Sequence, residues 1–169
     1  AQLLVKENGI IAGVDLAERI FHIFDDSLGF ERFMSDGDAI KVGDVIFTIE
    51  GSSRSILQAE RLVLNFMQRM SGVATTTRKA MDVLEGTPTR VLDTRKTTPG
   101  LRGFEKWAVA LGGGTNHRMG LYDMVLIKDN HVDYAGSMTA ALAGVQAYFD
   151  GGEPRVPVVV EVRSMSELN

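Results

Sequence analysis

The 169-residue chain contains no cysteine. This absence excludes disulfide bridges and zinc sites built from thiolates, and it fits a reducing compartment. The sequence also lacks any apolar run of the roughly 18 to 20 residues that a membrane-spanning helix needs, and its first residues, AQLLVKENGI, lack the basic-then-apolar pattern of a secretion signal. We therefore expect a globular protein of the cytoplasm that has no membrane partner.

The charge of the chain is unevenly distributed. The net charge of -4 argues against non-specific binding of nucleic acid. Residues 90 to 131, however, contain seven Lys or Arg against four Asp or Glu, so this window carries +3 while the rest of the chain carries -7. One basic window in an acidic protein favours a small anionic ligand over a nucleic acid.

The first third of the chain has the pattern of a small β scaffold. The segment DGDAIKVGDVIFTIEGSS, residues 36 to 53, alternates apolar and polar residues between Gly and Asp, which predicts half-buried antiparallel strands. Residues 15 to 25 place apolar side chains at helical spacing. We expect one helix packed on a small sheet.

A long helix is predicted to follow Ser52, which suits an N-cap, and to end near Ser71 and Gly72. Its apolar residues extend beyond one face, so we expect it to be buried or to lie between domains. Arg61 lies in its middle and needs a partner if it is buried. From the residues alone, that partner is Glu60 or another acidic residue.

After residue 72 the pattern changes to strands that alternate with helices. We predict helices over about 73–85, 101–111 and 137–149, strands over 90–93, 124–127 and 156–162, and a loop at 129–131. Apolar strands separated by helices favour a parallel sheet that is covered on both faces.

Charged residues follow the first two of these strands, lie in the glycine-rich segment GGGTNHRMG, or, for Glu161, lie on the third strand. In chain order they are Arg95, Lys96, His117, Arg118, Lys128 and Glu161. Chemistry in α/β folds is placed beyond the carboxyl ends of strands, so we expect these side chains to gather there. The cations would repel one another without a shared anion. Arginine suits a carboxylate, and lysine suits phosphate oxygens.

Three motifs, LDTRKTTPGLR, EKWAVALGGGTNHRMGLYDMVLIKDNH and ERLVLNFMQRMSGVAT, resemble quinolinate phosphoribosyltransferase, also called nicotinate-nucleotide pyrophosphorylase (carboxylating). The resemblance implies an α/β fold with two domains. Residues 1–71 would form an N-terminal α/β open-faced sandwich with an interdomain helix. Residues 72–169 would form the first part of an α/β barrel of alternating parallel strands and helices.

The resemblance also implies an activity of NAD biosynthesis. Quinolinate and 5-phosphoribosyl 1-pyrophosphate (PRPP), with Mg²⁺, would give nicotinate mononucleotide, pyrophosphate and carbon dioxide. The resemblance implies that Arg95, His117 and Arg118 bind the carboxylates, and that Arg61 is donated across a homodimer. It implies that Lys96 and Lys128 act as catalytic residues between the two substrates. Glu161 would contact the ribose or, through water, Mg²⁺.

The resemblance is incomplete at both ends, because the family's opening helices and later barrel strands have no counterpart here. We expect a fragment that is inactive by itself. Two other functions remain open: a related phosphoribosyltransferase that acts on another acid, and a non-enzymatic carrier module, because DGDAIKVGDVIFTIEG resembles the hammerhead sandwich of lipoyl and biotinyl domains.

Overall fold

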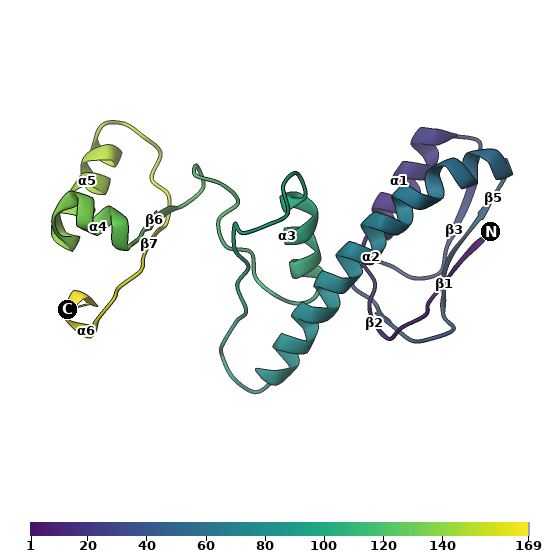
Figure 1. The fold of residues 1–169 in the computed structure, drawn as a ribbon, viewed down its shortest axis with the longest axis horizontal. Helices are drawn as coiled ribbons and strands as arrows, with labels where there is room; N and C mark the ends of the chain where they lie inside the picture. Colours follow the sequence, from purple (N-terminus) through teal and green to yellow (C-terminus); the bar gives the residue numbers. More distant parts are fainter. Residues whose placement is uncertain (169) are drawn as a thin grey trace. The chain divides into compact units, whose positions relative to one another are not determined.

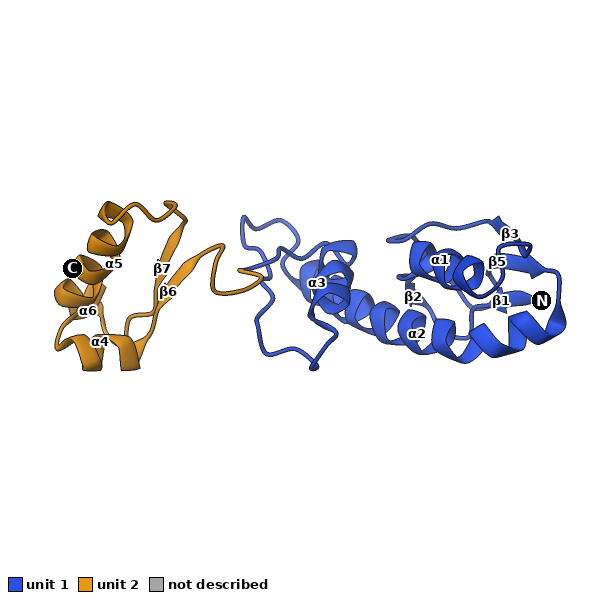
Figure 2. Cartoon of the chain, turned by 90° about the horizontal axis from the view of Figure 1, so that it is seen from above, with its two compact units in different colours: residues 1–117 blue, residues 118–169 orange. Residues whose placement is uncertain are grey.

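A computed structural model describes residues 1–168 and divides the chain into two compact units. The first unit covers residues 1–117 and the second begins at Arg118 (Figure 2). Within residues 1–168, none of the helices combines the length and the hydrophobicity needed to cross a membrane.

The first unit begins with short strands around one helix, as the alternating pattern predicts. Its elements are β1 (Gln2–Leu4), β2 (Gly9–Ile10), α1 (Val14–Phe24), β3 (Gly29–Arg32), β4 (Ala39–Ile40), β5 (Val45–Glu50), α2 (Ser53–Val83) and α3 (Arg102–Leu111) (Figure 1). The strand order of the main sheet is β1-β5-β3, and β2 pairs with β4; every one of these pairings is antiparallel.

The main core of this unit lies between the three-stranded sheet, α1 and the first half of α2. Ile46 and Phe47 of β5, Val14 of α1, and Ala59 and Val63 of α2 are all buried in it. Removing such side chains from water supplies most of the stabilisation of a small domain. The N-terminal part of the chain is therefore a helix-and-sheet unit of the predicted α/β class.

Helix α2 is one continuous helix, and the predicted break at Ser71 and Gly72 is wrong. Gly72 does not adopt the left-handed conformation that ends many helices. The Ser71 hydroxyl instead accepts a hydrogen bond from Ala12 N at 3.0 Å, and Thr75 Oγ1 accepts one from Ile10 N at 2.9 Å. These tertiary contacts outweigh the roughly 1 kcal/mol by which glycine disfavours a helix.

The second half of α2 packs against α3 through a smaller core. Met70 and Ala74 of α2 and Ala108 of α3 are buried there, and the Phe66 and Phe104 rings lie 4.8 Å apart. The predicted strand over residues 90–93 is wrong in extent, because only Leu92 pairs, in a parallel bridge with Thr115. Hydrogen bonds on both sides of the bridge still hold this segment extended, with Thr115 N donating to Val91 O at 2.8 Å.

The second unit contains the predicted parallel pair of strands. Its elements are β6 (Val125–Ile127), α4 (Asp129–Ala135), α5 (Met138–Asp150), β7 (Val158–Val160) and α6 (Met165–Leu168). Strands β6 and β7 pair in parallel with Ile127 opposite Val160. The predicted loop at residues 129–131 is wrong, because these residues begin α4. The described parallel pairings do not close a barrel.

Candidate active site

The seven predicted site residues are divided between the two units. Arg61, Arg95, Lys96 and His117 belong to the first unit, and Arg118, Lys128 and Glu161 belong to the second. Their convergence on one anionic ligand therefore stays a prediction. The structure shows how each group is held inside its own unit.

The segment that carries Arg95 and Lys96 starts from the Leu92 bridge. Asp93 N donates to Thr115 O at 3.2 Å, so the aspartate lies beside the glycine-rich segment. Lys96 N donates to Thr94 Oγ1 at 3.0 Å, which turns the chain immediately after the bridge. The two cations thus follow a single anchored bridge, where the sequence predicts a strand.

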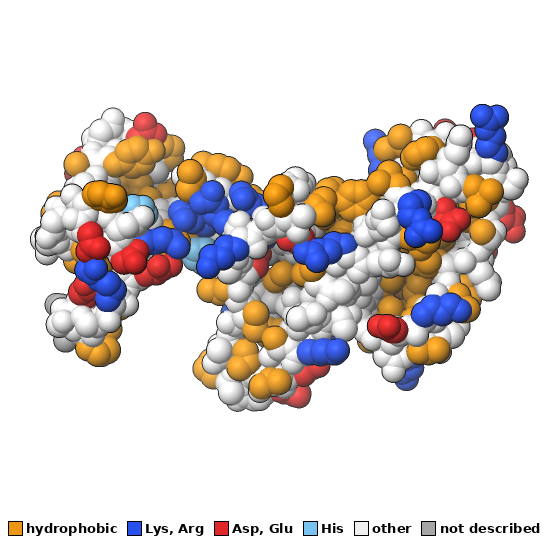
Figure 3. Space-filling view, in the orientation of Figure 1, with side chains coloured by type: hydrophobic (Ala, Val, Ile, Leu, Met, Phe, Trp, Pro, Cys, Tyr) orange, Lys and Arg blue, Asp and Glu red, His pale blue; other side chains and the backbone are white. Residues whose placement is uncertain are grey.

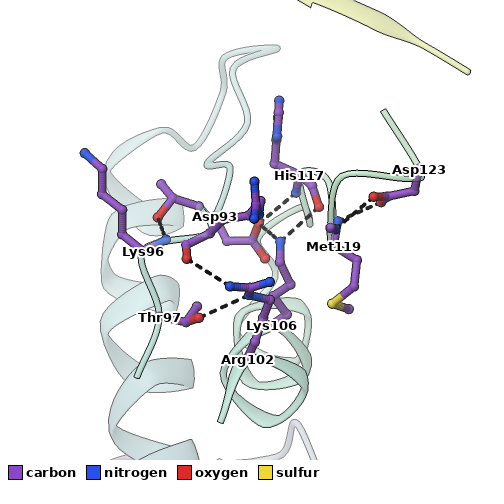
Figure 4. Close-up of polar contacts among 11 residues, drawn as sticks. Asp93, Lys96, Thr97, Arg102, Lys106, His117, Met119 and Asp123 are labelled. Atoms are coloured by element: carbon purple, nitrogen blue, oxygen red, sulfur yellow. Dashed lines mark hydrogen bonds and ion pairs between the residues drawn. The ribbon is translucent and has the colours of Figure 1, made fainter. Parts of the chain in front are cut away.

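The carboxylate of Asp93 forms a buried network with Lys106 of α3. The Lys106 side chain is 1% exposed, and its ammonium pairs with Asp93 Oδ1 and donates to His117 O at 2.9 Å. Asp93 Oδ1 accepts from His117 N at 2.8 Å (Figure 4). With its amide nitrogen facing the network, Asn116 donates to Asp93 Oδ2 at 2.7 Å. The buried charge of Lys106 is therefore compensated, and the backbone at His117 is fixed.

Arg95 and Lys96 differ in their surroundings. The Lys96 side chain is exposed and extends away from the Asp93–Lys106 pair (Figure 4). Arg95 is half-buried, and its Nε is a buried donor that has no hydrogen-bond partner among the described residues. An unsatisfied buried donor is costly, so Arg95 is suited to receive an anionic ligand.

Two further arginines hold the turn that follows. Arg102 Nε donates to Thr97 Oγ1 at 3.3 Å. Arg69 of α2 donates to Glu105 Oε1 from Nε at 3.0 Å and from Nη2 at 2.6 Å, while Thr98 N donates to Glu105 Oε2 at 3.2 Å. Burial raises the pKa of Glu105, but the hydrogen bonds from Arg69 and Thr98 lower it by more than burial raises it. The pKa of Glu105 therefore lies below its ordinary value. Glu105 is held as a carboxylate.

The three glycines after α3 are explained by packing against α2. A side chain at Gly112 would place a Cβ 2.4 Å from Ala74 O, and one at Gly114 would meet Thr77 Cγ2 at 2.8 Å. Gly113 adopts a positive φ of 91°. The glycine-rich segment thus allows a close approach to α2 and returns the chain to the Leu92 bridge.

In the second unit, parallel pairing brings Lys128 and Glu161 together. Each residue directly follows its strand, and Glu161 N donates to Ile127 O at 2.9 Å. Lys128 Nζ lies 3.5 Å from Glu161 Oε1, with both side chains partly exposed. Lys128 also caps α4, where its N donates to Nδ1 of His131 at 3.0 Å. Lys128 and Glu161 therefore lie side by side where the two parallel strands end.

Arg118 begins the second unit, where its Nη1 donates to Met124 O at 3.4 Å. Asp123 closes the intervening turn by accepting from Met119 N at 2.6 Å and Gly120 N at 2.9 Å. The arginine therefore leads into a turn with its own internal support.

Comparison with protein families matches both parts of the chain. Residues 1–71 match the family model described as "Quinolinate phosphoribosyl transferase, N-terminal domain", and residues 73–169 match the corresponding C-terminal domain. The chain belongs to the quinolinate phosphoribosyltransferase family.

Named relatives and solved structures agree with this assignment. Quinolinate phosphoribosyltransferase [decarboxylating] 1 of Nicotiana glauca is 50% identical over 168 residues, which cover 99% of this chain and 47% of the relative. NadC of Streptococcus pyogenes superposes with a TM-score of 0.92 at 43% identity, covering 98% of this chain and 58% of that one. The nicotinate-nucleotide pyrophosphorylase of Francisella tularensis gives 0.94 at 39% identity, covering 100% and 59%. The chain spans about half the length of the curated relatives it matches.

Arg61 lies on an exposed part of α2. The expected salt bridge with Glu60 is not formed, and Arg61 makes no ion pair with any other residue of the described part of the chain. Adjacent residues on a helix point in different directions, which explains why Glu60 is no partner. Leu57 and Leu62 nearby are also exposed. Figure 3 likewise shows apolar side chains on one face of residues 1–117, between separate basic ones.

Residues 1–168 contain no group of three or more His, Cys, Asp or Glu side chains that could together hold a metal ion. Glu161 is a single, partly exposed carboxylate. Magnesium keeps several waters and is often held by one or two carboxylates together with substrate phosphates. Glu161 therefore fits a Mg²⁺ ion that is carried by a substrate, but it does not form a metal cage.

Sequence reasoning missed four residues that support the site: Arg69, Glu105, Lys106 and Asn116. Charged residues are mostly exposed, so nothing in the pattern of α3 marked Glu105 and Lys106 as buried. Their charge order gives no signal either, because the adjacent pair Glu31 and Arg32 has the same order and is exposed.

Proposed function

We propose that the protein which contains this chain transfers the phosphoribosyl group of PRPP to quinolinate and releases pyrophosphate and carbon dioxide, giving nicotinate mononucleotide for NAD biosynthesis. The observation that carries the proposal is the unpartnered buried Nε of Arg95, which follows an anchored bridge in a chain of this family. A planar guanidinium with a free donor suits one of the two quinolinate carboxylates.

In this proposal the binding roles divide by charge type. Arg95, His117 and Arg118 bind the carboxylates of quinolinate. Lys96 and Lys128 act between quinolinate and PRPP, where compact ammonium groups stabilise phosphate oxygens and the departing pyrophosphate. The exposed side chain of Lys96 supports its role, because it can reach a ligand. Lys128 is also partly exposed, and its ion pair with Glu161 holds it at the strand end where the substrates are proposed to bind.

The reaction breaks the bond between ribose C1 and pyrophosphate, and the ribose carbon becomes positively charged. Glu161 faces this charge and stabilises it. The ring nitrogen of quinolinate then bonds to C1 and becomes cationic, which stabilises the electron pair left when the neighbouring carboxylate departs as carbon dioxide. When bound, Mg²⁺ would neutralise charge on the leaving pyrophosphate, and Glu161 would be the residue that holds it through water.

The proposal includes a homodimer in which Arg61 is donated to the neighbouring subunit's site. Support comes from the exposure of Arg61, from its lack of an ion pair within the described residues, and from the exposed leucines beside it. An apolar surface around a cation favours an interface whose anionic partner lies on another molecule. We also propose a cytoplasmic location, which the lack of cysteine supports; fluorescence microscopy of a tagged protein tests it.

The test is a reaction of the natural polypeptide that contains this chain with quinolinate, PRPP and Mg²⁺. We expect nicotinate mononucleotide and carbon dioxide in equal amounts, and strong loss of both in Arg95→Ala. Nicotinate, which has one carboxylate fewer, is the control substrate. Product from nicotinate but not from quinolinate would favour the related phosphoribosyltransferase that acts on another acid.

The carrier-module alternative has weaker support. Residues 1–71 match the N-terminal model of the transferase family, and the strands of residues 36–53 belong to that match.

A further inference from the structure

Two consecutive residues of α3 are buried and carry opposite charges. Glu105 is 8% exposed and Lys106 is 1% exposed. They bind the two ends of the segment 93–98, which carries the cations Arg95 and Lys96. Because buried charges are costly unless they are paired and hydrogen-bonded, such an arrangement invites an explanation beyond the general packing of α3.

Lys106 holds the first end of the segment. Its ammonium pairs with Asp93, whose carboxylate also accepts the amide hydrogen of His117. A single buried pair thus fixes both the residue that precedes the cations and the backbone of His117. Figure 4 shows these contacts meeting at Asp93.

Glu105 holds the second end. One of its oxygens accepts the amide hydrogen of Thr98, and the other accepts two hydrogen bonds from Arg69. Arg69 Nη2 also donates to Thr98 Oγ1 at 3.1 Å. The contact therefore links the segment to both α2 and α3.

At each end an acidic side chain is paired with a basic one, so the pairs Asp93–Lys106 and Glu105–Arg69 add little net charge. The positive charge of the segment remains that of Arg95 and Lys96. Only residues 94–97 lie between the fastened ends. So short a segment has little freedom left to lose when a ligand binds.

We propose that Glu105 and Lys106 are positioning residues, which hold the segment 93–98 at both ends so that Arg95 and Lys96 are preorganised for the anionic substrates. The inference rests on the proposed function. It differs from a general packing role because it requires that loosening either end weakens ligand binding in protein that is still folded.

The principal variant is Glu105→Gln in the natural polypeptide that contains this chain. It keeps the size of the side chain but removes the charge that Arg69 and Thr98 bind. The matched control is Glu18→Gln, which removes a carboxylate that pairs with Arg32 at 2.6 Å in the N-terminal part of the same unit. The second variant is the double change Asp93→Asn with Lys106→Met, which removes both buried charges and leaves neither unpaired.

Two quantities are measured at a temperature where unfolding curves show every variant folded: hydrogen exchange of the Thr98 and His117 amides, and the KM for quinolinate. We expect faster exchange at Thr98 in Glu105→Gln, faster exchange at His117 in the double variant, and a KM that rises about tenfold or more in both. Glu18→Gln should leave the KM unchanged.

Faster exchange with an unchanged KM would overturn the inference and leave the proposed function standing. A similar rise of the KM in Glu18→Gln would also overturn it, because the effect would then reflect stability alone. If the unaltered protein makes no product from quinolinate, the proposed function fails, and the inference fails with it.

Discussion

Arg69 and Glu105 are joined by two hydrogen bonds, from Nε at 3.0 Å and Nη2 at 2.6 Å to the same carboxylate oxygen, although they lie 36 residues apart in the chain. The pair fastens the middle of α2 to the first turns of α3. It also determines how the unit should respond to acid.

Stability should fall with pH as Glu105 is protonated. Its pKa is depressed in the folded state, so its stabilising contribution is present above the unfolded value of about 4.3 and is lost as pH falls through the folded value. At pH 7, Glu105→Gln should lower the free energy of unfolding by about 2 kcal/mol. Urea unfolding at pH 7 and pH 3 measures this. The difference between the two proteins should shrink at pH 3, and an equal difference at both values would contradict the prediction.

Replacing Gly112 with alanine should destabilise the first unit. The new Cβ would lie 2.4 Å from Ala74 O and 2.7 Å from Thr77 Cβ, which forces α2 and α3 apart. We expect a loss of about 2 to 3 kcal/mol in thermal or urea unfolding. The control is Gly72→Ala, because a Cβ at this position of α2 would meet no atom within 4 Å. Alanine favours a helix over glycine, so this change should raise the free energy of unfolding by up to about 1 kcal/mol. Equal effects of the two changes would show that α2 and α3 do not pack as described.

Arginine and lysine variants should separate the two substrates. Arg118→Lys should weaken quinolinate binding by about 1 to 3 kcal/mol and affect PRPP less, because an ammonium cannot replace the two parallel hydrogen bonds of a guanidinium. Lys96→Ala and Lys128→Ala should instead lower turnover, since stabilisation of the leaving group is lost. Calorimetric titration with each ligand, together with kcat, checks this. Equal losses for both ligands in Arg118→Lys would contradict the assignment.

Two inactive variants should restore activity when their subunits are mixed. If Arg61 serves the neighbouring site, a hybrid of Arg61→Ala and Arg118→Ala subunits has one site with both arginines and one with neither. Random exchange should then recover about a quarter of the unaltered activity. Native mass spectrometry confirms the exchange. Hybrid dimers without activity would place Arg61 outside the neighbouring site.

The elements that follow periodic patterns could be predicted from the sequence. Ser52, a residue that suits an N-cap, marked the start of α2. The apolar run at β6 predicted a parallel strand whose next residue, Lys128, lies beside Glu161. The error at the middle of α2 came from a long-range contact. Ser71 and Gly72 form a local stop signal, but the backbone at Ala12 binds the Ser71 hydroxyl and the helix continues.

In the candidate site, too, the cations could be predicted from the sequence but the residues that support them could not. Arg95 and Lys96 were visible in the sequence because they follow a predicted strand inside the one basic window of an acidic chain. Their supports were not visible, because the burial of Lys106 depends on Asp93, thirteen residues earlier, and on the carbonyl of His117. No local pattern reports a partner that only the fold brings near.

Because α2 is continuous, the number of residues in it sets how its two halves are rotated relative to each other about the helix axis. Its first half is seated in one core and its second half in another. Inserting a single residue near Ser71, at the boundary between the two family models, would turn one half by about 100° against the other and shift it by about 1.5 Å. The two halves of α2 could not then both pack into their cores. Exchange of domains between relatives should therefore succeed only where the junction preserves the exact residue count of this helix, whatever the similarity of the parts it joins.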